Sequence, residues 1–238
     1  MKSMFKKKNP IKKFKRDIRE YFFFKDKRPL FDVNFNGIEF ADENFKDRKR
    51  EPYFEYGAAL EEVFAPAEIM DIGCANGYLL EYFYKRGLAE IKGLELAESA
   101  FRYMSSEVKN KVDRMDLSKS IAVDSGLLEK RYYLVNCTEV GEHIPYKYEN
   151  IFLNNIERFV ERYLVLSWAD TWEGWHGIDR QSHVNPRSKR YVKKKLHFLN
   201  LEFNKKLTKD LIGSMEKRNV CKHWIDRVMV FEKGRLEG

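Results

Sequence analysis

The sequence predicts an α/β fold in which helices cover both faces of a mostly parallel sheet of seven strands. Two observations lead to this prediction. From Ala67 onward, short apolar runs of strand length alternate with stretches of helical periodicity. The first run ends in Asp71, and a turn of small residues and a helix start follow it directly. Such alternation is typical of parallel sheets, which bind ligands at the carboxyl ends of their strands.

The expected elements follow one another with short connections. A first helix is expected at residues 53–64, followed by strand 68–72, helix 77–86, strand 91–95, helix 98–109 and strand 111–115. Then come strand 133–138, helix 149–161, strand 163–168, helix 187–198 and two late strands at 201–205 and 225–232. Right-handed crossovers bring the carboxyl ends of parallel strands to one edge of the sheet, so we expect the functional residues there.

The length of 238 residues fits one α/β domain with short additions. The net charge of +8 is concentrated at the N-terminus, because Met1 to Arg16 contain seven lysines, one arginine and no acidic residue. We therefore expect a basic N-terminal arm and lead-in helix over residues 1–52, with an amphipathic helix at 10–24, and a folded domain over residues 53–238. Three roles for the arm stay open: binding nucleic acid, binding an anionic membrane, or acting as a solubilising tail.

The composition excludes several classes of protein. A hydrophobic fraction of 43% and a charged fraction of 34% are typical of a soluble globular protein. No apolar run approaches the ~20 residues of a membrane-spanning helix, and Met1 to Arg16 lack the apolar core of a secretory signal. The three cysteines, Cys74, Cys137 and Cys221, are far apart, which argues against a disulfide framework or a zinc site. We therefore expect a protein of the reducing cytoplasm.

The most informative segment begins at Asp71 and reads Asp-Ile-Gly-Cys-Ala-Asn-Gly. Gly73 allows a tight turn, while Ala75 and Gly77 allow a ligand to approach the main chain closely. A helix start after such a turn suits a pyrophosphate, but the carboxylate of Asp71 would repel one. A cationic ligand with an amino group and a sulfonium centre suits Asp71 better.

Two further acids follow the next two expected strands. Glu95 ends the second strand about 20 residues after the glycine turn, where a carboxylate accepts hydrogen bonds from ribose hydroxyls. Asp116 follows the third strand, where it is placed to accept from an adenine amino group while Met115 lies against the ring. The three acids together indicate an adenosine-containing ligand.

From about Tyr56 to Glu232, this pattern resembles the class I S-adenosylmethionine-dependent methyltransferases. The run from Asp71 to Gly77 resembles their glycine-rich first motif, with Ala75 in place of the more usual glycine. The resemblance implies a Rossmann-like fold and S-adenosyl-L-methionine as the cofactor. It implies these cofactor-binding residues: Asp71, Gly73, Cys74, Ala75, Gly77, Glu95, Leu96, Asp116 and Thr138. Two alternatives stay open, namely NAD binding and a turn that only packs a helix on the sheet.

The residues after the fourth and fifth strands suggest a second site. Glu139, Glu142 and His143 are spaced so that a helical turn beginning there would point all three to one side. His183 follows the fifth strand, which neighbours the fourth in this fold. Two carboxylates and two imidazoles make a mixed oxygen and nitrogen site for a divalent ion such as Mg²⁺ or Mn²⁺.

This segment resembles those of the RNA 3′-terminal 2′-O-methyltransferases and the ubiquinone-pathway O-methyltransferases. The resemblance implies that Glu139, Glu142, His143 and His183 hold a metal that lowers the pKa of a substrate hydroxyl and orients its oxygen. The aromatic stretch from Asp170 to Ser182 departs from both groups. Two alternatives without a metal stay open. In one, Glu142 caps a helix and His143 packs beside the cofactor; in the other, His143 or His183 acts as the general base. The expected catalytic residues are Glu142, His143 and His183.

The sequence therefore predicts an S-adenosylmethionine-dependent enzyme that methylates a hydroxyl of a small metabolite or glycan. An RNA 2′-O-methyltransferase is the first alternative, supported by the basic arm and the run Lys189–Lys195. A net-neutral folded part and the lack of a recognisable RNA-binding module argue against it. A non-catalytic binding or scaffold protein with a cofactor fold is the second alternative. His197 and His223 have no motif around them and are expected at the surface.

Overall fold

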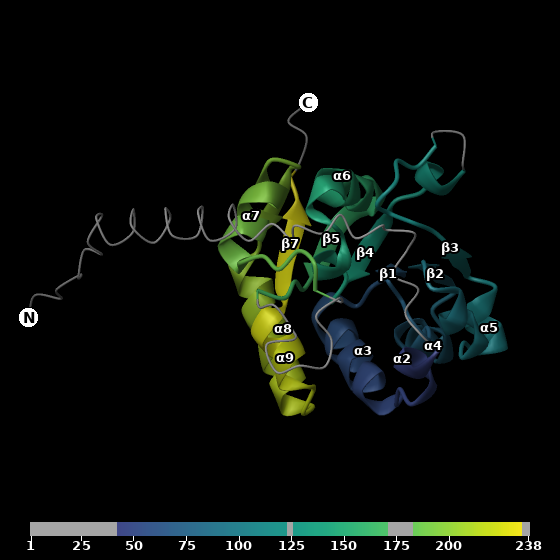
Figure 1. The fold of residues 1–238 in the computed structure, drawn as a ribbon. Helices are drawn as coiled ribbons and strands as arrows, with labels where there is room; N and C mark the ends of the chain where they lie inside the picture. The colour runs from purple at the N-terminus through teal and green to yellow at the C-terminus, as the bar shows by residue number, and fades with distance from the viewer. Residues whose placement is uncertain (1–41, 123–125, 171–182, 235–238) are drawn as a thin grey trace, which may run out of the picture. The chain divides into compact units, whose positions relative to one another are not determined.

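The computed structural model describes residues 42–122, 126–170 and 183–234, which all belong to one compact unit. The basic arm and the helix expected at 10–24 lie outside the described residues, as does the aromatic stretch 171–182. Figure 1 gives the arrangement of helices and strands. None of the helices in the described ranges is both long and apolar enough to cross a bilayer.

Seven strands form one sheet in the order β3-β2-β1-β4-β5-β7-β6. In chain order the strands are β1 (Glu68–Ile72), β2 (Glu90–Glu95), β3 (Val112–Arg114), β4 (Tyr132–Cys137), β5 (Val160–Leu166), β6 (Leu201–Phe203) and β7 (Met229–Lys233). The first five pair in parallel, whereas β7 is antiparallel to both of its neighbours, β5 and β6. The predicted fold class, a mostly parallel sheet with helices on both faces, is confirmed.

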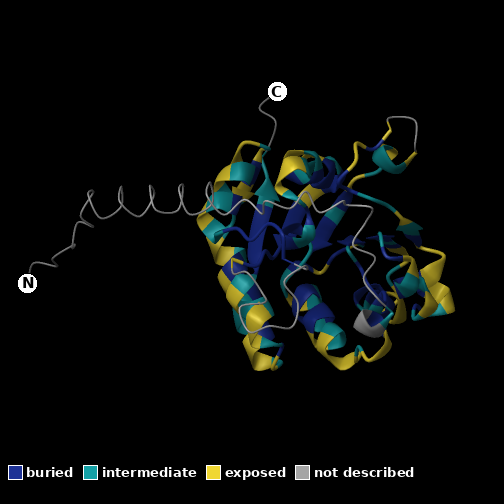
Figure 2. Cartoon of the chain, in the orientation of Figure 1, coloured by how far each residue is buried: buried dark blue, intermediate teal, exposed yellow. Residues whose placement is uncertain are grey.

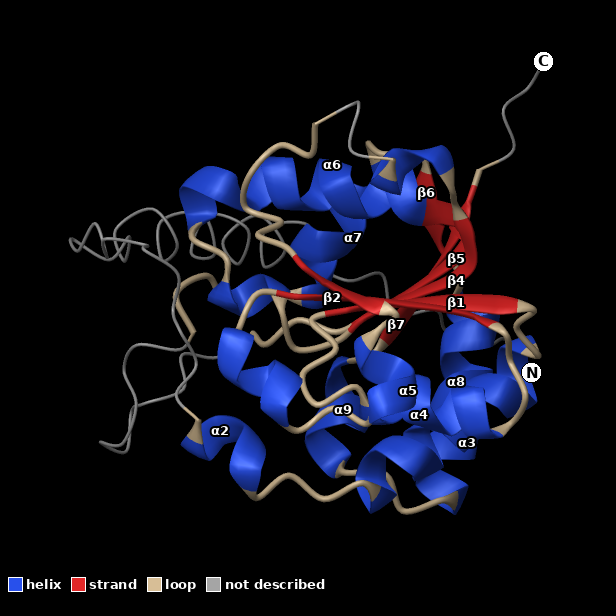
Figure 3. Cartoon of the chain, turned by 90° about the vertical axis from the view of Figure 1, so that its right-hand side faces the viewer, coloured by secondary structure: helices blue, strands red, loops and turns tan. Residues whose placement is uncertain are grey.

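Helices cover both faces of this sheet (Figure 3). One face carries α2 (Glu43–Lys46), α3 (Glu51–Phe64), α4 (Tyr78–Lys85), α5 (Ser106–Lys109), α8 (Lys205–Lys217) and α9 (Lys222–Arg227). The other carries α6 (Glu149–Phe159) and α7 (Lys189–His197). Within the described ranges there are also four short 3-10 helices: η1 (Glu98–Arg102), η2 (Leu127–Glu129), η3 (Gly141–His143) and η4 (Tyr146–Tyr148).

The central strands are buried on both sides, so successive residues enter opposite hydrophobic cores (Figure 2). Ile69 and Leu134 join the core beneath α3, α4 and α8. Met70 and Val135 join the core beneath α6 and α7. This two-sided burial explains why the strands are continuous apolar runs rather than alternating ones.

The sequence misplaced several boundaries after β5. The expected strand 225–232 is wrong over its first half, because α9 extends to Arg227 and β7 starts only at Met229. The strand expected at 201–205 ends at Phe203, because Asn204 accepts a hydrogen bond from the Leu207 N–H at 3.0 Å and caps α8, which the sequence did not predict.

Earlier boundaries differ less. The helix expected at 98–109 is split into η1 and α5 by Ser105, whose backbone is extended. Helix α3 starts at Glu51, with Pro52 in its first turn, where its missing N–H costs nothing. Phe45 precedes it and is buried in the core, so packing begins before residue 53.

The contact between α3 and α4 makes a stability prediction. A Cβ atom on Gly57 would lie 2.5 Å from Cδ1 of Tyr82. The Tyr82 ring cannot move freely, because its hydroxyl donates to Glu61 at 2.5 Å and its edge packs against Phe54. Overpacking of this kind costs about 1–3 kcal/mol. We expect Gly57→Ala to lower the free energy of unfolding by about that amount, measured by urea denaturation.

Gly213 of α8 is the matched control, because a Cβ atom there meets no atom within 4 Å. Gly213→Ala is expected to raise the free energy of unfolding by roughly 0.5–1 kcal/mol, since alanine is the better helix former. If Gly57→Ala stabilised the protein as much as Gly213→Ala, the conclusion that the α3–α4 contact has no room for a Cβ atom at Gly57 would be wrong.

Candidate functional site

The structure brings the three predicted acids to the carboxyl ends of adjacent strands. Asp71 is in β1, Glu95 ends β2, and Asp116 follows β3. These strands are neighbours in the sheet, so the acids follow one another along a single edge. The candidate cofactor site therefore lies along this edge, on the side of β3.

Asp71 is a buried acid without an ion-pair partner among the described residues. Its Oδ1 accepts a hydrogen bond from Asn136 Nδ2 at 2.7 Å, and Tyr56 in turn donates to Asn136 Oδ1 at 2.8 Å. Burial raises the pKa of Asp71 to about 7, the hydrogen bond from Asn136 opposes that rise, and the charge of Glu95 adds to it. A cationic group bound next to Asp71 would satisfy this carboxylate.

The turn after β1 has an unusual backbone. Gly73 and Gly77 have φ angles of 70° and 69°, and Ala75 has a φ of 48°. The left-handed region costs an alanine roughly 1–2 kcal/mol, which explains why glycine is more usual at this position. Asn76 Oδ1 is buried and accepts no hydrogen bond from the described residues. The strain and the unused acceptor both lie where a ligand is expected.

Glu95 holds this turn in shape. Its Oε2 accepts from the Ala75 N–H at 2.8 Å, and its Oε1 accepts from the N–H groups of Leu96 and Ala97 at 2.8 and 2.9 Å. Burial raises the pKa of Glu95, although these hydrogen bonds lower it. Each carboxylate oxygen has two lone pairs, so Glu95 keeps acceptor capacity for ribose hydroxyls.

The other predicted cofactor-binding residues differ in which of their atoms a ligand could reach. Asp116 Oδ1 accepts from both the N–H and the hydroxyl of Ser118, at 3.0 and 2.6 Å. The side chain of Cys74 is buried in the core, so only its backbone is available to a ligand. Thr138 is half-buried and contacts Asn136 Nδ2 at 3.3 Å.

Sequence reasoning missed the aromatic residues near Asp71. Tyr53 and Tyr56 of α3 pack against Trp224 of α9, with ring centroids 5.1 and 5.5 Å apart. Arg48 donates to the Tyr53 hydroxyl at 2.6 Å. The spacing of the two tyrosines one helical turn apart is the signal that could have identified them. No local signal links Trp224 or Arg48 to this site.

Three of the four predicted metal ligands lie together. Glu142 and His143 belong to η3, and His183 approaches them from the segment after β5. One potential ligand atom from each residue lies within 4.8 Å of those of the other two. The imidazole rings have centroids 5.0 Å apart. Glu142 and His183 are buried and His143 is half-buried, so a small cation would be largely enclosed.

Glu142 is the most unusual residue of this cluster. Its side chain has no solvent exposure, and neither carboxylate oxygen has a well-formed hydrogen bond to a described residue, although the backbone N–H groups of Glu142 and Ala169 lie close enough to lower its pKa. Burial raises its pKa well above the ordinary value, and the nearby charge of Glu139 raises it further. Buried polar atoms without partners are rare in folded proteins, and a metal ion is one explanation for them.

Glu139 does not join the cluster. The prediction that a helical turn aligns Glu139 with Glu142 was wrong, because the turn is a short 3-10 helix that begins only at Gly141. Glu139 itself has a left-handed backbone, with a φ of 57°. Its carboxylate forms a salt bridge with Arg227 at 2.5 Å and accepts from the Ser167 hydroxyl at 2.7 Å.

The lysine run of α7 is less solvated than the sequence suggests. Lys189 donates to the carbonyl of Val228 at 3.4 Å, and Lys195 lies 2.8 Å from Asn150 Oδ1. Lys193 lies over the ring of Phe203. His197 and His223 are exposed, as predicted.

No protein-family model matches this sequence, and no curated protein is similar to it in sequence. Solved structures, however, share its fold. The magnesium protoporphyrin IX methyltransferase of Synechocystis PCC 6803, with S-adenosylhomocysteine bound, is 14% identical with a TM-score of 0.54. The similarity covers 92% of this chain and 100% of that one. The chain has the class I methyltransferase fold.

Two further structures show how widely this fold is used. The methyltransferase domain of bacterial CtHen1-C is 14% identical, with a TM-score of 0.53, and the similarity covers 78% of this chain and 98% of that one. The [4+2]-cyclase SpnF is 9% identical, with a TM-score of 0.51 and coverage of 76% and 80%. Because a cyclase shares the class I fold, the reaction must be inferred from the site itself.

The buried acid Asp71 predicts a pH dependence of stability. Its pKa is about 7 in the folded protein and 3.8 ordinarily, so the folded state holds a proton that the unfolded chain releases. The stability that the neutral Asp71 gives the folded protein is fully present below the ordinary pKa of 3.8. It is lost as the pH rises through the folded-state pKa of about 7. Asp71→Asn cannot ionise. We expect this variant to be more stable than the wild type at pH 8, by at most roughly 4 kcal/mol, in urea denaturation.

The difference should shrink when the same measurement is made at pH 5, where Asp71 is protonated in the folded state. Asp113→Asn is the control, because the Asp113 side chain is 44% exposed and pairs with Lys92. It is expected to change the stability by less than about 0.5 kcal/mol at either pH. If the Asp71→Asn variant were less stable than the wild type at pH 8, the conclusion that Asp71 is a buried carboxylate without an ion-pair partner would be wrong.

Proposed function

We propose that this protein is an S-adenosylmethionine-dependent methyltransferase that methylates a hydroxyl group of a small acceptor, with the help of a divalent metal ion. One observation carries the proposal. Asp71, near the end of β1, and Glu142, in the η3 turn that follows the neighbouring strand β4, are buried carboxylates without an ion pair to any described residue. Both act on the buried thiol of Cys137, whose pKa is raised chiefly by burial and then by these two charges.

The environment of Asp71 fits the cationic end of the cofactor. The amino group and the sulfonium of S-adenosylmethionine supply the positive charge that this carboxylate lacks. Glu95 would accept from the ribose hydroxyls and Asp116 from the adenine amino group. Leu96 and Thr138 would line the pocket, and the backbone of Gly73, Cys74, Ala75 and Gly77 would contact the cofactor.

The carboxylate of the cofactor's methionine group needs a positively charged partner. Arg48 is a candidate, because its guanidinium donates to Tyr53 and lowers the pKa of Glu95. Tyr53 in turn feels the charge of Asp71, which contributes to its raised pKa after the larger effect of burial. Arg48 and Asp71 would therefore bind the opposite charges of one amino-acid group.

The residues of the second cluster fit a divalent ion. Glu142 offers two unpartnered buried oxygens, and His143 and His183 offer ring nitrogens within 4.8 Å of them. One carboxylate and two imidazoles suit Mn²⁺ better than Mg²⁺, which prefers oxygen ligands only. Glu139 is not part of this proposed set, since it pairs with Arg227.

The proposed chemistry divides between the two sites. When bound, the cofactor would supply a methyl group to an acceptor oxygen: the S–C bond would break as the O–C bond forms, leaving S-adenosylhomocysteine, and the hydroxyl proton would pass to the solvent. The metal, when bound, lowers the pKa of that hydroxyl. Asp71 and Glu95 hold the donor in place, while Glu142, His143 and His183 hold the acceptor side together. The burial of Glu142 and His183 keeps water away from the reacting oxygen.

A small acceptor is better supported than an RNA. Two lysines of α7 contact other parts of the protein, namely Lys189 and Lys195. The described part of the lysine run is therefore not a continuous cationic face for phosphates. The free thiols of Cys74, Cys137 and Cys221 suit the reducing cytoplasm.

Calorimetric titration with S-adenosylmethionine and S-adenosylhomocysteine tests the cofactor site. We expect micromolar binding to the wild type and a roughly 10- to 100-fold weaker affinity for Asp71→Asn, because a charge-assisted hydrogen bond to the amino group is lost. Asp113→Asn should bind like the wild type. If the wild type bound neither compound, the methyltransferase proposal would be wrong and a binding or scaffold protein would replace it.

Titration with Mn²⁺ in the presence of S-adenosylhomocysteine tests the second cluster. Glu142→Gln and His183→Ala are each expected to abolish measurable Mn²⁺ binding while leaving the affinity for S-adenosylhomocysteine within about twofold, because the two sites use different residues. His197→Ala is the control, since His197 is exposed and its Nδ1 pairs with Glu202 at 2.6 Å. If a chelator left the activity of the wild type unchanged, the proposed metal ion would be wrong, and a histidine would be the general base instead.

A further inference from the structure

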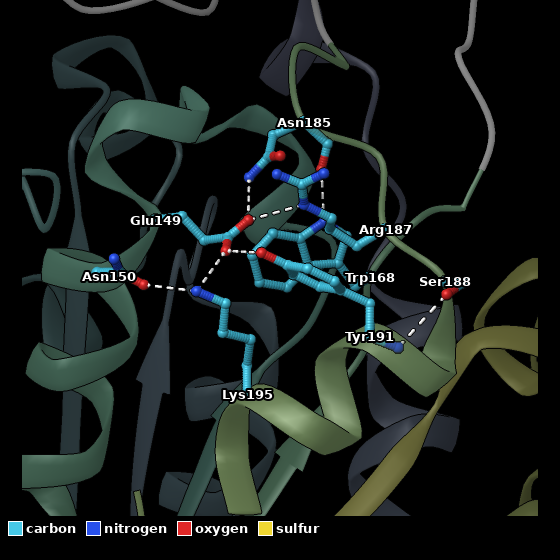
Figure 4. Close-up of polar contacts among 8 residues, drawn as sticks. All are labelled: Glu149, Asn150, Trp168, Asn185, Arg187, Ser188, Tyr191 and Lys195. Carbon is cyan, nitrogen blue, oxygen red and sulfur yellow. Dashed lines mark hydrogen bonds and ion pairs between the residues drawn. The ribbon is translucent and has the colours of Figure 1, made fainter. Parts of the chain in front are cut away.

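A second buried carboxylate on the acceptor side, Glu149, has many partners. It is the first residue of α6, and only 1% of its surface is exposed. Its Oε2 accepts from Arg187 Nε at 2.8 Å and from Asn185 Nδ2 at 3.0 Å. Its Oε1 accepts from the Tyr191 hydroxyl at 2.6 Å, and Lys195 Nζ lies 3.5 Å away (Figure 4). Glu149 thus contrasts with Glu142, whose oxygens have no described partner.

These partners keep Glu149 ionised. Burial alone would raise its pKa, but the charge of Arg187 and the hydrogen bonds from Tyr191, Asn185 and Arg187 outweigh burial and lower the pKa. The N-terminus of α6 also favours a negative charge at this position. Glu149 is therefore a fixed anion to which other segments bind.

The segments that bind Glu149 carry the proposed metal ligands. Asn185 and Arg187 follow His183 by two and four positions. The guanidinium of Arg187 lies between the rings of Tyr146 and Tyr191, at 4.9 and 4.6 Å from their centroids. Tyr146 follows His143 by three positions. The Arg187–Glu149 pair therefore joins the two chain segments from which the cluster is built.

Backbone hydrogen bonds complete this connection. The N–H of Asn185 donates to the carbonyl of Glu142 at 2.9 Å, and the N–H of Arg187 donates to the carbonyl of Ala169, also at 2.9 Å. The indole N–H of Trp168 donates to the carbonyl of Asn185 at 2.7 Å (Figure 4). The chain from His183 to Arg187 is thus held on both sides, with its first residue next to Glu142.

We propose that Glu149 is a positioning residue for the acceptor side, which fixes segment 183–187 and thereby holds His183 against Glu142 and His143. This inference rests on the proposed function for the identity of the ligands. A buried ion pair is often replaceable by apolar residues without loss of stability, so stability alone does not explain Glu149. Residues that orient metal ligands from outside the coordination shell typically change metal affinity by 10- to 100-fold when they are replaced.

The experiment compares Mn²⁺ and S-adenosylhomocysteine affinities by calorimetry in Glu149→Gln, Asn185→Ala and Lys195→Ala. We expect the first two variants to bind Mn²⁺ roughly 10- to 100-fold more weakly and S-adenosylhomocysteine normally. Lys195→Ala is the matched control, because Lys195 reaches the same carboxylate from its more exposed side and is not part of segment 183–187. It should bind both ligands within about twofold of the wild type, because Lys195 lies 3.5 Å from the carboxylate and its own side chain is partly exposed.

Amide hydrogen exchange of the same variants gives a readout that needs no metal. Exchange at Asn185 and Arg187 should become faster in Glu149→Gln, while exchange in β1 and β2 stays slow. If the wild type binds no Mn²⁺, the metal part of the proposed function is wrong and this exchange still decides the role of Glu149. Wild-type Mn²⁺ affinity together with unchanged exchange in Glu149→Gln overturns the inference. Should that variant not fold, Asn185→Ala decides in the same way.

Discussion

The register of β1 against its two neighbours is the constraint on which the candidate site depends. Asp71 pairs with Gly93 of β2 and with Asn136 of β4. This pairing puts the amide of Asn136 next to the carboxylate of Asp71. A slip of one residue would replace Asn136 by Val135 or Cys137 and would turn every side chain of the strand to the other face. The apolar residues that fix the register of β1 therefore also fix the position of Asp71 beside Asn136.

The same register shapes the turn after β1. Leu94 follows Gly93, and its carbonyl accepts from the N–H groups of Gly73 and Cys74 at 2.8 and 3.3 Å. Glu95 comes next and accepts from the Ala75 N–H. Two consecutive residues of β2 thus hold the glycine-rich turn by hydrogen bonds. The backbone strain at Ala75 is retained because these neighbours stabilise the turn.

The local part of this arrangement was predictable from the sequence. Strand β1 was predicted with its observed bounds, and the acids near the carboxyl ends of β1, β2 and β3 follow from apolar runs that end in a carboxylate. The failures involve contacts between distant residues. Glu139 was expected on a helical turn, but its salt bridge with Arg227 joins residues 88 positions apart. The end of α9, from Ile225 to Arg227, was predicted as part of a strand because the apolar run of β7 follows it closely.

The network around Glu149 had no sequence signal for a similar reason. Its hydrogen bonds to Asn185, Arg187 and Tyr191 span 36, 38 and 42 positions. A glutamate at the start of a helix is adequately explained by the helix dipole alone. Periodicity predicts which elements form, but it cannot predict which buried charge a distant loop will bind.

The pKa of Asp71 has a consequence for the thermodynamics of ligand binding. Near neutral pH, a substantial fraction of the ligand-free molecules carries a proton on this carboxyl group, because burial raises its pKa to about 7. A cation that binds there favours the ionised form and displaces that proton into the solvent. Binding would therefore be an exchange of a proton for a cation, and its measured enthalpy would include the heat of protonating the buffer. The same exchange would make the apparent affinity rise with pH until Asp71 is fully ionised.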